Sequence, residues 1–158
     1  MIHYVFDLDD TIIMHNNIRH INYDLISEDH SLTQLLDNCK GPRYIYTNGT
    51  GGHALTVLNK MNIKHYFDKI YSRDTIPFMK PDERSINDVH NDILYRYQSK
   101  EDIIFFFDDR LENLKIAKEK GWLTFWIHPN AGMGNQYKFV TMSFLTIKDC
   151  LRYLETKY

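Results

Sequence analysis

Three carboxylates stand within four positions near the start of the chain, in the stretch HYVFDLDDTI at residues 3–12. Asp7, Asp9 and Asp10 follow apolar residues that are typical of a buried strand. Two carboxylates about 5 Å apart repel each other by roughly 3 kcal/mol at an effective dielectric constant near 20. Because a bound divalent cation commonly offsets such repulsion, the stretch suggests a metal site.

Three later stretches carry polar groups that suit the same chemistry. They are TNG at 47–49, KP at 80–81 and FFDDRLENLKIAKEKG at 106–121. The carboxylate of Asp109 is a hard oxygen ligand of the kind that Mg²⁺ prefers. Lys80 supplies a positive charge for phosphoryl oxygens, and the Thr47 hydroxyl can donate a hydrogen bond to them. Together these residue types indicate phosphate binding and phosphoryl transfer.

Apolar periodicity predicts the elements that must position these groups. Runs rich in β-branched and aromatic residues predict five strands, at 3–8, 43–48, 69–72, 102–108 and 123–128. Apolar residues spaced by three and four predict helices at 31–39, 53–62, 83–98, 111–121 and 146–155. This alternation predicts an α/β fold, a Rossmann-like, doubly wound, mostly parallel five-stranded sheet with helices on both faces. The polar stretches then meet at the carboxyl ends of the strands, where such sheets bind ligands.

Composition limits the class of protein. A length of 158 residues with 43% hydrophobic and 14% aromatic residues predicts one globular domain spanning 1–158. The net charge of −2, without a run of Lys and Arg, predicts neither a general nucleic-acid patch nor a membrane surface. Cys39 and Cys150 stand in no metal-binding pattern, which predicts reduced thiols. With no stretch that reads as a membrane span or signal peptide, we expect a cytoplasmic protein.

The four stretches, in this order at predicted strand ends, resemble the four motifs of the haloacid dehalogenase-like superfamily, in particular its phosphatases. The resemblance runs over essentially the whole chain. It implies a Mg²⁺-dependent phosphomonoester hydrolase that works through an aspartyl-phosphate intermediate. Asp7 would be the nucleophile and Asp9 the general acid and base. Residues two apart on an extended strand end point to the same side, so both carboxylates can face one phosphoryl group.

The resemblance also implies a ligand set. Mg²⁺ would be held by Asp7, by the backbone carbonyl of Asp9 and by Asp109, while Asp108 would hold a water molecule or orient the ligands around the metal. Asn113 would orient the loop that carries Asp109. The residues that would bind the substrate phosphate are Thr47, Asn48, Gly49 and Lys80. Lys80 would also restrain the nucleophile.

Other residues that could do chemistry are predicted to be structural. Asp10 reads as a turn residue and Thr11 as a residue that shapes the loop. The spacings of the eight histidines, such as His15 with His20 or His53 with His65, match no metal-ligand motif. His128, at the end of the last predicted strand, is the histidine whose place at the mouth of the site stays open.

The spacing between motifs bears on the substrate. Family members carry cap domains after the first or second motif, but here the intervals to Thr47 and Lys80 are already occupied by predicted elements. We therefore expect no full cap domain, only a short flap or minimal cap at 12–29. Capless members tend to act on bulky substrates, so the expected partner is a phosphorylated small molecule or macromolecule. The chain resembles capless magnesium-dependent phosphatases and, less closely, nucleotidase-like relatives.

Several alternatives stay open on the sequence alone. Within enzymes, the motifs also fit a 5'-nucleotidase or a phosphotransferase. A receiver-like signalling domain would place its acceptor aspartate after the third strand, where Asp74 stands, but its Lys-Pro after the fifth, and here Lys80 and Pro81 come too early. The third alternative is a binding module of the same fold without catalytic activity, although no residue of the four motifs is missing.

Overall fold

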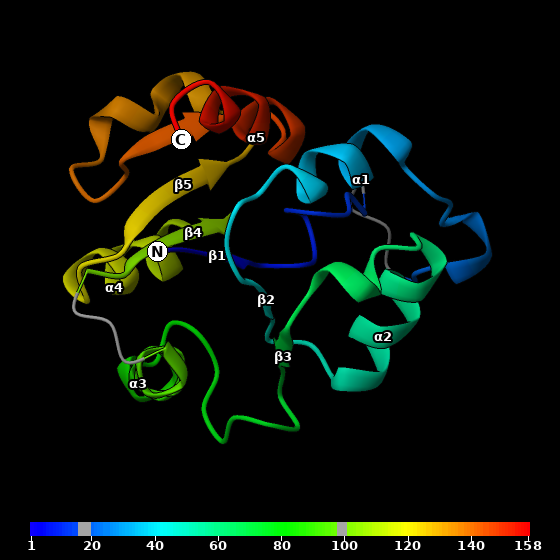
Figure 1. The fold of residues 1–158 in the computed structure, drawn as a ribbon, viewed down its shortest axis with the longest axis horizontal. Coiled ribbons are helices and arrows are strands. Elements are labelled where there is room, and N and C mark those ends of the chain that lie inside the picture. The colour runs from blue at the N-terminus through cyan, green and yellow to red at the C-terminus, as the bar shows by residue number, and fades with distance from the viewer. Residues whose placement is uncertain (16–19, 98–100) are drawn as a thin grey trace.

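Strands and helices alternate along the chain in the computed structural model, which describes residues 1–15, 20–97 and 101–158 (Figure 1). The strands are β1 (Ile2–Phe6), β2 (Arg43–Tyr46), β3 (Lys69–Tyr71), β4 (Ile103–Asp108), β5 (Leu123–Ile127) and β6 (Met142–Phe144). The α-helices are α1 (His30–Asp37), α2 (Gly51–Lys60), α3 (Glu83–Tyr97), α4 (Leu111–Glu119) and α5 (Ile147–Glu155). Short 3₁₀ helices are η1 (Tyr23–Leu25), η2 (Lys64–Tyr66) and η3 (Ala131–Gln136).

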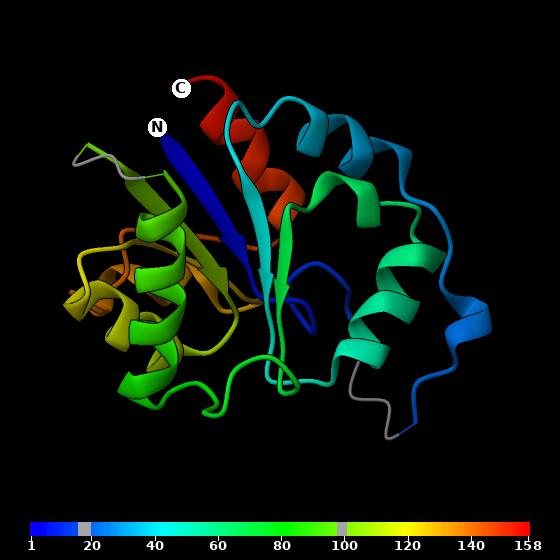
Figure 2. The same ribbon diagram turned by 60° about the horizontal axis from the view of Figure 1, so that its bottom comes forward.

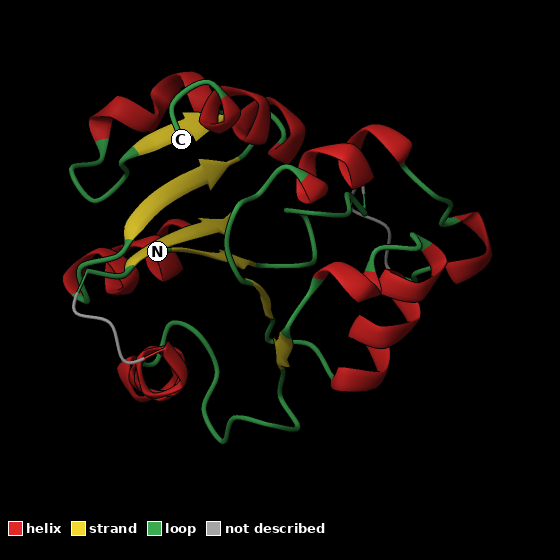
Figure 3. Ribbon diagram, in the orientation of Figure 1, coloured by secondary structure: helices red, strands yellow, loops and turns green. Residues whose placement is uncertain are grey.

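All six strands form one parallel sheet in the order β3-β2-β1-β4-β5-β6 (Figure 3). The chain starts in the middle of the sheet, builds outward through β2 and β3, and then returns to the other side of β1 with β4. The strand order therefore reverses between β1 and β4. Ligands of doubly wound sheets bind outside the carboxyl ends of the strands at this reversal.

Over the residues that the structure describes, the sheet has six strands, so the predicted number of five is wrong. The additional strand, β6, pairs in parallel with β5 and forms one edge of the sheet. It is only three residues long, Met142–Phe144, and each of its side chains is only partly buried. Such a short edge strand lacks the continuous apolar run by which the buried strands can be recognised.

Helices cover both faces of the sheet (Figure 2). Alternate side chains of β1 point to opposite faces, with Phe6 on the side of α1, α2 and α5 and Val5 on the side of α3 and α4. Phe107 and Phe106 of β4 divide in the same way. Burial on both faces removes most of the strands' apolar surface from water. Each large apolar side chain that is fully buried stabilises the fold by about 1.5–3 kcal/mol. This two-sided core explains why the central strands are apolar at nearly every position.

The connections between the first three strands contain few elements. In the described residues, the chain between β1 and β2 contains only η1 and α1, and the chain between β2 and β3 contains only α2 and η2. Neither insertion is large enough for a cap domain. Residues 16–19 of the predicted 12–29 flap, and position 98 at the predicted end of the third helix, lie outside the described residues. In the ranges that the structure describes, no helix has both the length and the apolar character needed to span a membrane.

Asp29 connects α1 to α5. Its carboxylate accepts a hydrogen bond from the Leu32 N–H at 3.1 Å, which caps α1, and another from the Lys148 Nζ at 2.9 Å. Partial burial by itself would raise the pKa of Asp29, but the hydrogen bonds from Lys148, Ser31 and Leu32 lower it to about 2. In the unfolded chain the Asp29 carboxyl group has its ordinary pKa of about 3.9. The stabilisation from Asp29 is therefore complete at neutral pH and is lost as the pH falls from about 4 to about 2.

We expect Asp29→Asn to lower the free energy of unfolding by about 1 kcal/mol or less at pH 7, because asparagine keeps the cap and loses only the ion pair. The difference from the wild type should shrink by pH 3, where the wild-type carboxylate has lost much of its contribution. Urea denaturation at the two pH values measures it. A difference that is equal at pH 7 and pH 3 would contradict the assigned role of the charge.

Candidate active site

Polar side chains from the ends of β1, β2 and β4 meet in a pocket of about 320 Å³. Its lining residues are Asp7, Asp9, Asp10, Thr47, Asn48, Gly49, Lys80, Asp109, Arg110 and Asn113. The set includes every predicted site residue except Asp108, which lies fully buried behind the pocket. The parallel register of β1 with β2 and β4 brings these residues to one edge of the sheet.

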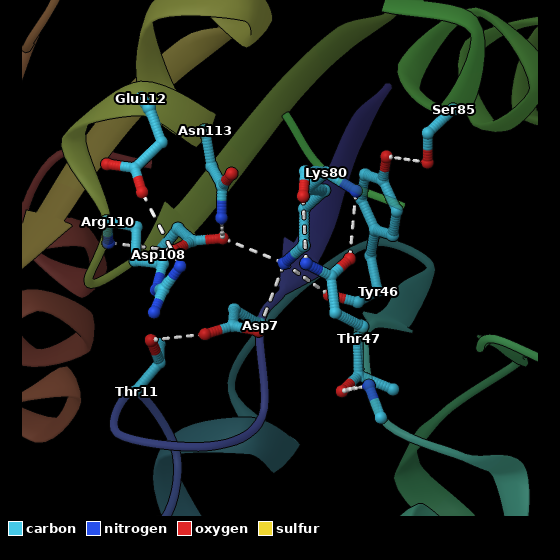
Figure 4. A network of polar contacts seen from close by, with 12 residues as sticks. Asp7, Thr11, Tyr46, Thr47, Lys80, Ser85, Asp108, Arg110, Glu112 and Asn113 are labelled. Atoms are coloured by element: carbon cyan, nitrogen blue, oxygen red, sulfur yellow. Dashed lines mark hydrogen bonds and ion pairs between the residues drawn. The ribbon is translucent and has the colours of Figure 1, made fainter. Parts of the chain in front are cut away.

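Lys80 is the centre of this network (Figure 4). Its Nζ donates to Asp7 Oδ1 at 3.0 Å, to Asp108 Oδ2 at 2.8 Å and to the Tyr46 carbonyl at 2.8 Å. The side chain is only 1% exposed. Burial by itself lowers the pKa of Lys80, but the carboxylates of Asp108 and Asp7 outweigh it and raise the pKa above its usual value. Lys80 is therefore a fixed positive charge at the base of the pocket.

Asn48 holds the backbone of Lys80 in place. The Asn48 Nδ2 donates to the Lys80 carbonyl at 2.9 Å, and its Oδ1 accepts from the Lys80 N–H at 2.8 Å. This reciprocal pair connects the end of β2 to the loop before α3. The Asn48 amide therefore positions the lysine, and a direct contact between Asn48 and phosphate stays a prediction.

Thr47 and Gly49 form a tight turn after β2. The Thr47 Oγ1 accepts a hydrogen bond from the Gly49 N–H at 3.0 Å. A Cβ atom on Gly49 would lie 3.3 Å from this oxygen and 3.3 Å from the ring of His53. Both contacts are tighter than ordinary van der Waals packing, so glycine allows the turn, the helix α2 and the pocket to lie close together.

Asp7 is fixed at both of its carboxylate oxygens. Lys80 binds Oδ1, and the Thr11 hydroxyl donates to Oδ2 at 3.1 Å. The Asp7 N–H also donates to the Phe107 carbonyl at 2.9 Å, which continues the pairing of β1 with β4. Thr11 was predicted to shape the loop, but its hydroxyl binds a side chain, the carboxylate on which the proposed chemistry would depend.

The acidic cluster has more negative charge than its protein neighbours neutralise. The carboxylate oxygens of Asp7, Asp108 and Asp109 lie within 4.8 Å of one another. Burial, followed by the charge of Asp108, raises the pKa of Asp7 to about 6 against the opposing effect of Lys80. Burial and the charges of Asp108 and Asp7 raise the pKa of Asp109 to about 8. A hard divalent cation would offset this repulsion, so the donor set fits Mg²⁺.

Asn113 adds a further observation that fits a hydrated cation. Its Nδ2 donates to Asp108 Oδ2 at 3.1 Å. Its Oδ1 is buried and has no hydrogen-bond partner among the described residues. Mg²⁺ usually keeps several waters, which are hydrogen-bond donors and can satisfy such an acceptor. Asp108 is already committed to Lys80, Asn113 and the Arg110 N–H, so it supports the site from behind.

Two histidines that were not predicted to belong to the site lie against Asp9. The Nε2 atoms of His15 and His53 are 2.5 Å and 2.8 Å from Asp9 Oδ1. Their spacing matches no linear motif, which is why they were predicted to be structural. A usable signal was the position of His53 in the first turn of α2, where the Thr50 hydroxyl caps the helix by accepting the His53 N–H.

Asp10 is a turn residue, with φ 60° and its carboxylate bound to the His15 N–H.

His128 is not among the residues that line the pocket. Its ring stacks on Trp126 with the ring centroids 4.8 Å apart, and the Trp126 Nε1 donates to the Asp109 carbonyl at 2.9 Å. His128 therefore supports the tryptophan that holds the backbone of Asp109.

Comparison with known proteins gave one family match and a group of similar folds. A family model described as haloacid dehalogenase-like hydrolase matches residues 16–127, which contain Thr47, Lys80 and Asp109 but not Asp7 or Asp9. A search of curated protein sequences found no match.

Some solved structures resemble this chain over their whole length and others over part of it. A Thermotoga maritima protein, provisionally named a beta-phosphoglucomutase, superposes with a TM-score of 0.72 at 14% identity over 100% of both chains. The core domain of a Streptococcus pneumoniae TIGR4 protein, provisionally named a phosphoglycolate phosphatase, gives 0.65 at 19% identity, covering 98% of this chain and 96% of that one. The L-2-haloacid dehalogenase of Xanthobacter autotrophicus gives 0.62 at 14% identity, over 86% of this chain but only 64% of its own. At these identities the likeness shows the fold alone.

Proposed function

The chain belongs to the haloacid dehalogenase-like hydrolases, and from that premise we propose that it is a Mg²⁺-dependent phosphomonoester hydrolase. The observation that carries the proposal is the buried Lys80 between Asp7 and Asp108, beside a pocket that Asp9 and Asp109 also line. This arrangement combines a restrained carboxylate nucleophile, a second carboxylate and a place for a cation. A carbon–halogen bond releases halide without a proton, so dehalogenation gives Asp9 and the acidic cluster no task.

The proposed first step transfers the phosphoryl group to Asp7. A carboxylate oxygen of Asp7 forms a bond to phosphorus while the bond from phosphorus to the leaving oxygen breaks. Asp9 gives its proton to that leaving oxygen, which keeps the electron pair of the broken bond. Lys80 and Thr11 hold the Asp7 carboxylate in one orientation for this attack.

The second step releases phosphate and restores both aspartates. Asp9, now a carboxylate, takes a proton from a water molecule as the water oxygen bonds to phosphorus. The bond between phosphorus and Asp7 breaks, and Asp7 recovers its negative charge. The net reaction adds one water across the phosphoester bond.

Asp7 and Asp109, with the backbone carbonyl of Asp9, would hold Mg²⁺, supported by Asp108 and Asn113. The cation supplies neutralising charge to the phosphoryl oxygens. The proposed contacts to the substrate phosphate come from Thr47, Asn48, Gly49 and Lys80.

We further propose that residues 1–158 form a single catalytic domain with a minimal cap at 12–29, working in the cytoplasm on a phosphorylated small molecule or macromolecule. A nucleotidase or phosphotransferase would use the same steps, with a different leaving group or acceptor. The small size of the described insertions supports a site that accepts bulky substrates.

The proposal is tested by hydrolysis of p-nitrophenyl phosphate in Mg²⁺ and after removal of divalent cations with EDTA. We expect turnover in Mg²⁺ and a loss of at least about tenfold in EDTA, restored by added Mg²⁺. Turnover no faster than that of buffer, or equal turnover with and without the cation, would overturn the proposal.

Mg²⁺ is also expected to stabilise the fold, because it binds the acidic cluster only in the native state. At a concentration 100-fold above its Kd the gain is about 2.7 kcal/mol, which raises Tm by roughly 5–10 °C for a chain of this size. Thermal denaturation with and without Mg²⁺ measures the shift. Asp109→Asn should reduce it strongly, whereas Asp149→Asn, at an exposed position on α5, should leave it unchanged. An equal shift in both variants would contradict the assigned cation site.

A further inference from the structure

We propose that His15, His53 and Tyr23 are positioning residues that hold the Asp9 carboxylate so that its Oδ2 is the oxygen that carries the proton. This inference rests on the proposed function, in which Asp9 is the acid and base. It also gives the segment at 12–29 a task, because His15 and Tyr23 both come from it.

The two carboxylate oxygens of Asp9 have different surroundings. Oδ1 lies 2.5 Å from the Nε2 of His15 and 2.8 Å from the Nε2 of His53. Oδ2 lies toward the turn formed by Thr47 and Gly49. It is 3.7 Å from the position that a Cβ atom on Gly49 would occupy. The imidazoles therefore occupy one oxygen, and the other faces the loop after β2.

The Tyr23 hydroxyl is placed to select the tautomer of the His53 ring. The Tyr23 hydroxyl lies 2.8 Å from the Nδ1 of His53. When the hydroxyl donates to Nδ1, the ring hydrogen of neutral His53 is on Nε2, which then donates to Asp9. Tyr23 belongs to η1 and His53 to α2, so the contact also connects η1 to the helix beside the pocket.

Two donors on Oδ1 decide where a proton on Asp9 can reside. A carboxyl group has one carbonyl-type oxygen that accepts hydrogen bonds and one hydroxyl oxygen that carries the proton. A carboxylate oxygen can only accept hydrogen bonds, so contact with Oδ1 requires each Nε2 to donate. Oδ1 then keeps the acceptor role, and the proton is left to Oδ2. In the first step this proton moves from Oδ2 to the leaving oxygen as the bond to phosphorus breaks. In the second step Oδ2 takes a proton from the attacking water.

The distances favour hydrogen bonds over a second metal site made of the same three side chains. A tetrahedral metal with nitrogen and oxygen ligands at about 2.0–2.1 Å would separate its ligand atoms by roughly 3.3 Å. The separations of 2.5 Å and 2.8 Å are both shorter than this. The 2.8 Å contact of His53 lies in the range of N–H···O hydrogen bonds to a carboxylate, and the contact of His15 is shorter still.

The test uses leaving groups that differ in their need for a proton. p-Nitrophenolate leaves readily without one, whereas phenolate from phenyl phosphate, a substrate of nearly the same shape, depends more on the acid. We expect His53→Leu to lower kcat for phenyl phosphate by roughly 100-fold and for p-nitrophenyl phosphate by less than about tenfold, with KM changed little. His53→Gln, whose amide can donate to the same oxygen, should recover most of the loss.

Matched controls separate positioning from a general effect on the fold. His30→Leu, at a side chain that is 89% exposed on α1, should leave both rates unchanged. Tyr23→Phe removes only a hydroxyl and should show the same dependence on the leaving group with a smaller loss, about fivefold for phenyl phosphate. If His53→Leu does not fold, His15→Leu and Tyr23→Phe give the same comparison.

Equal losses for both substrates in these variants, or no loss in a folded variant, would overturn the inference while the proposed function stands. A wild-type protein that hydrolyses neither substrate would instead overturn the proposed function, and the inference with it.

Discussion

Asp7→Asn is expected to abolish phosphatase turnover, lowering kcat by roughly 10⁴-fold or more, because the carboxamide cannot form the aspartyl-phosphate bond. Asparagine has nearly the shape of aspartate, and its oxygen can still accept from Lys80 or Thr11. Initial rates of p-nitrophenyl phosphate hydrolysis at saturating Mg²⁺ measure the effect. The proposed phosphate contacts of the remaining pocket residues are unchanged in this variant, so the loss should appear in kcat far more than in KM.

Asp10→Asn is the matched control for this substitution. Asp10 lies in the same acidic stretch, with a left-handed φ of 60° that asparagine tolerates and a contact to the His15 N–H that asparagine can keep. We expect its kcat to stay within about threefold of wild type. Comparable losses in both variants would contradict the separation of Asp7 as nucleophile from Asp10 as turn residue.

Stability distinguishes loss of the nucleophile from loss of the fold. Asp7→Asn removes one of three neighbouring buried or half-buried carboxylates. In the absence of Mg²⁺, the free energy of unfolding should therefore not fall below that of the wild type by more than about 1 kcal/mol. An unfolded Asp7→Asn protein would show that the carboxylate is needed for structure before chemistry.

The central strands were predictable because both of their faces are buried. Val5 and Phe6, and Phe106 and Phe107, point to opposite faces, and each is fully buried. This produces continuous apolar runs that stand out in the sequence. The edge strand Met142–Phe144 has no such signal, because its pairing with β5 depends on the rest of the sheet being in place.

Much of the candidate site was predictable for a related reason. Parallel strands align their carboxyl ends, so polar residues that follow β1, β2 and β4 had to meet. Contacts between segments are different. His53 and Asp9 are 44 residues apart, and the Asn48 amide turns to Lys80, 32 residues away. The packing of α2 and of the loop before α3 determines these contacts. No local pattern of residues encodes that packing.

Lys80→Met is expected to lower the free energy of unfolding by about 3–5 kcal/mol and to abolish turnover. Methionine fills a similar volume but leaves Asp108, with a side chain that is 0% exposed, and Asp7, at 11%, without their shared positive charge. Two buried carboxylates then face each other with no cation between them. Urea denaturation of the Mg²⁺-free protein measures the loss.

The double variant Lys80→Met with Asp108→Asn separates electrostatics from packing. If the penalty comes from uncompensated charge, removing one of the two carboxylates should make the double variant more stable than Lys80→Met alone, by about 1–3 kcal/mol. Lys69→Met is the matched control, because Lys69 pairs with Asp92 at 2.9 Å but is 30% exposed, and such a pair contributes about 1 kcal/mol or less. A double variant as unstable as the sum of its single substitutions would show that Lys80 stabilises the fold through its packing. Turnover should be absent in both Lys80 variants, because restoring stability does not restore the charge that restrains Asp7.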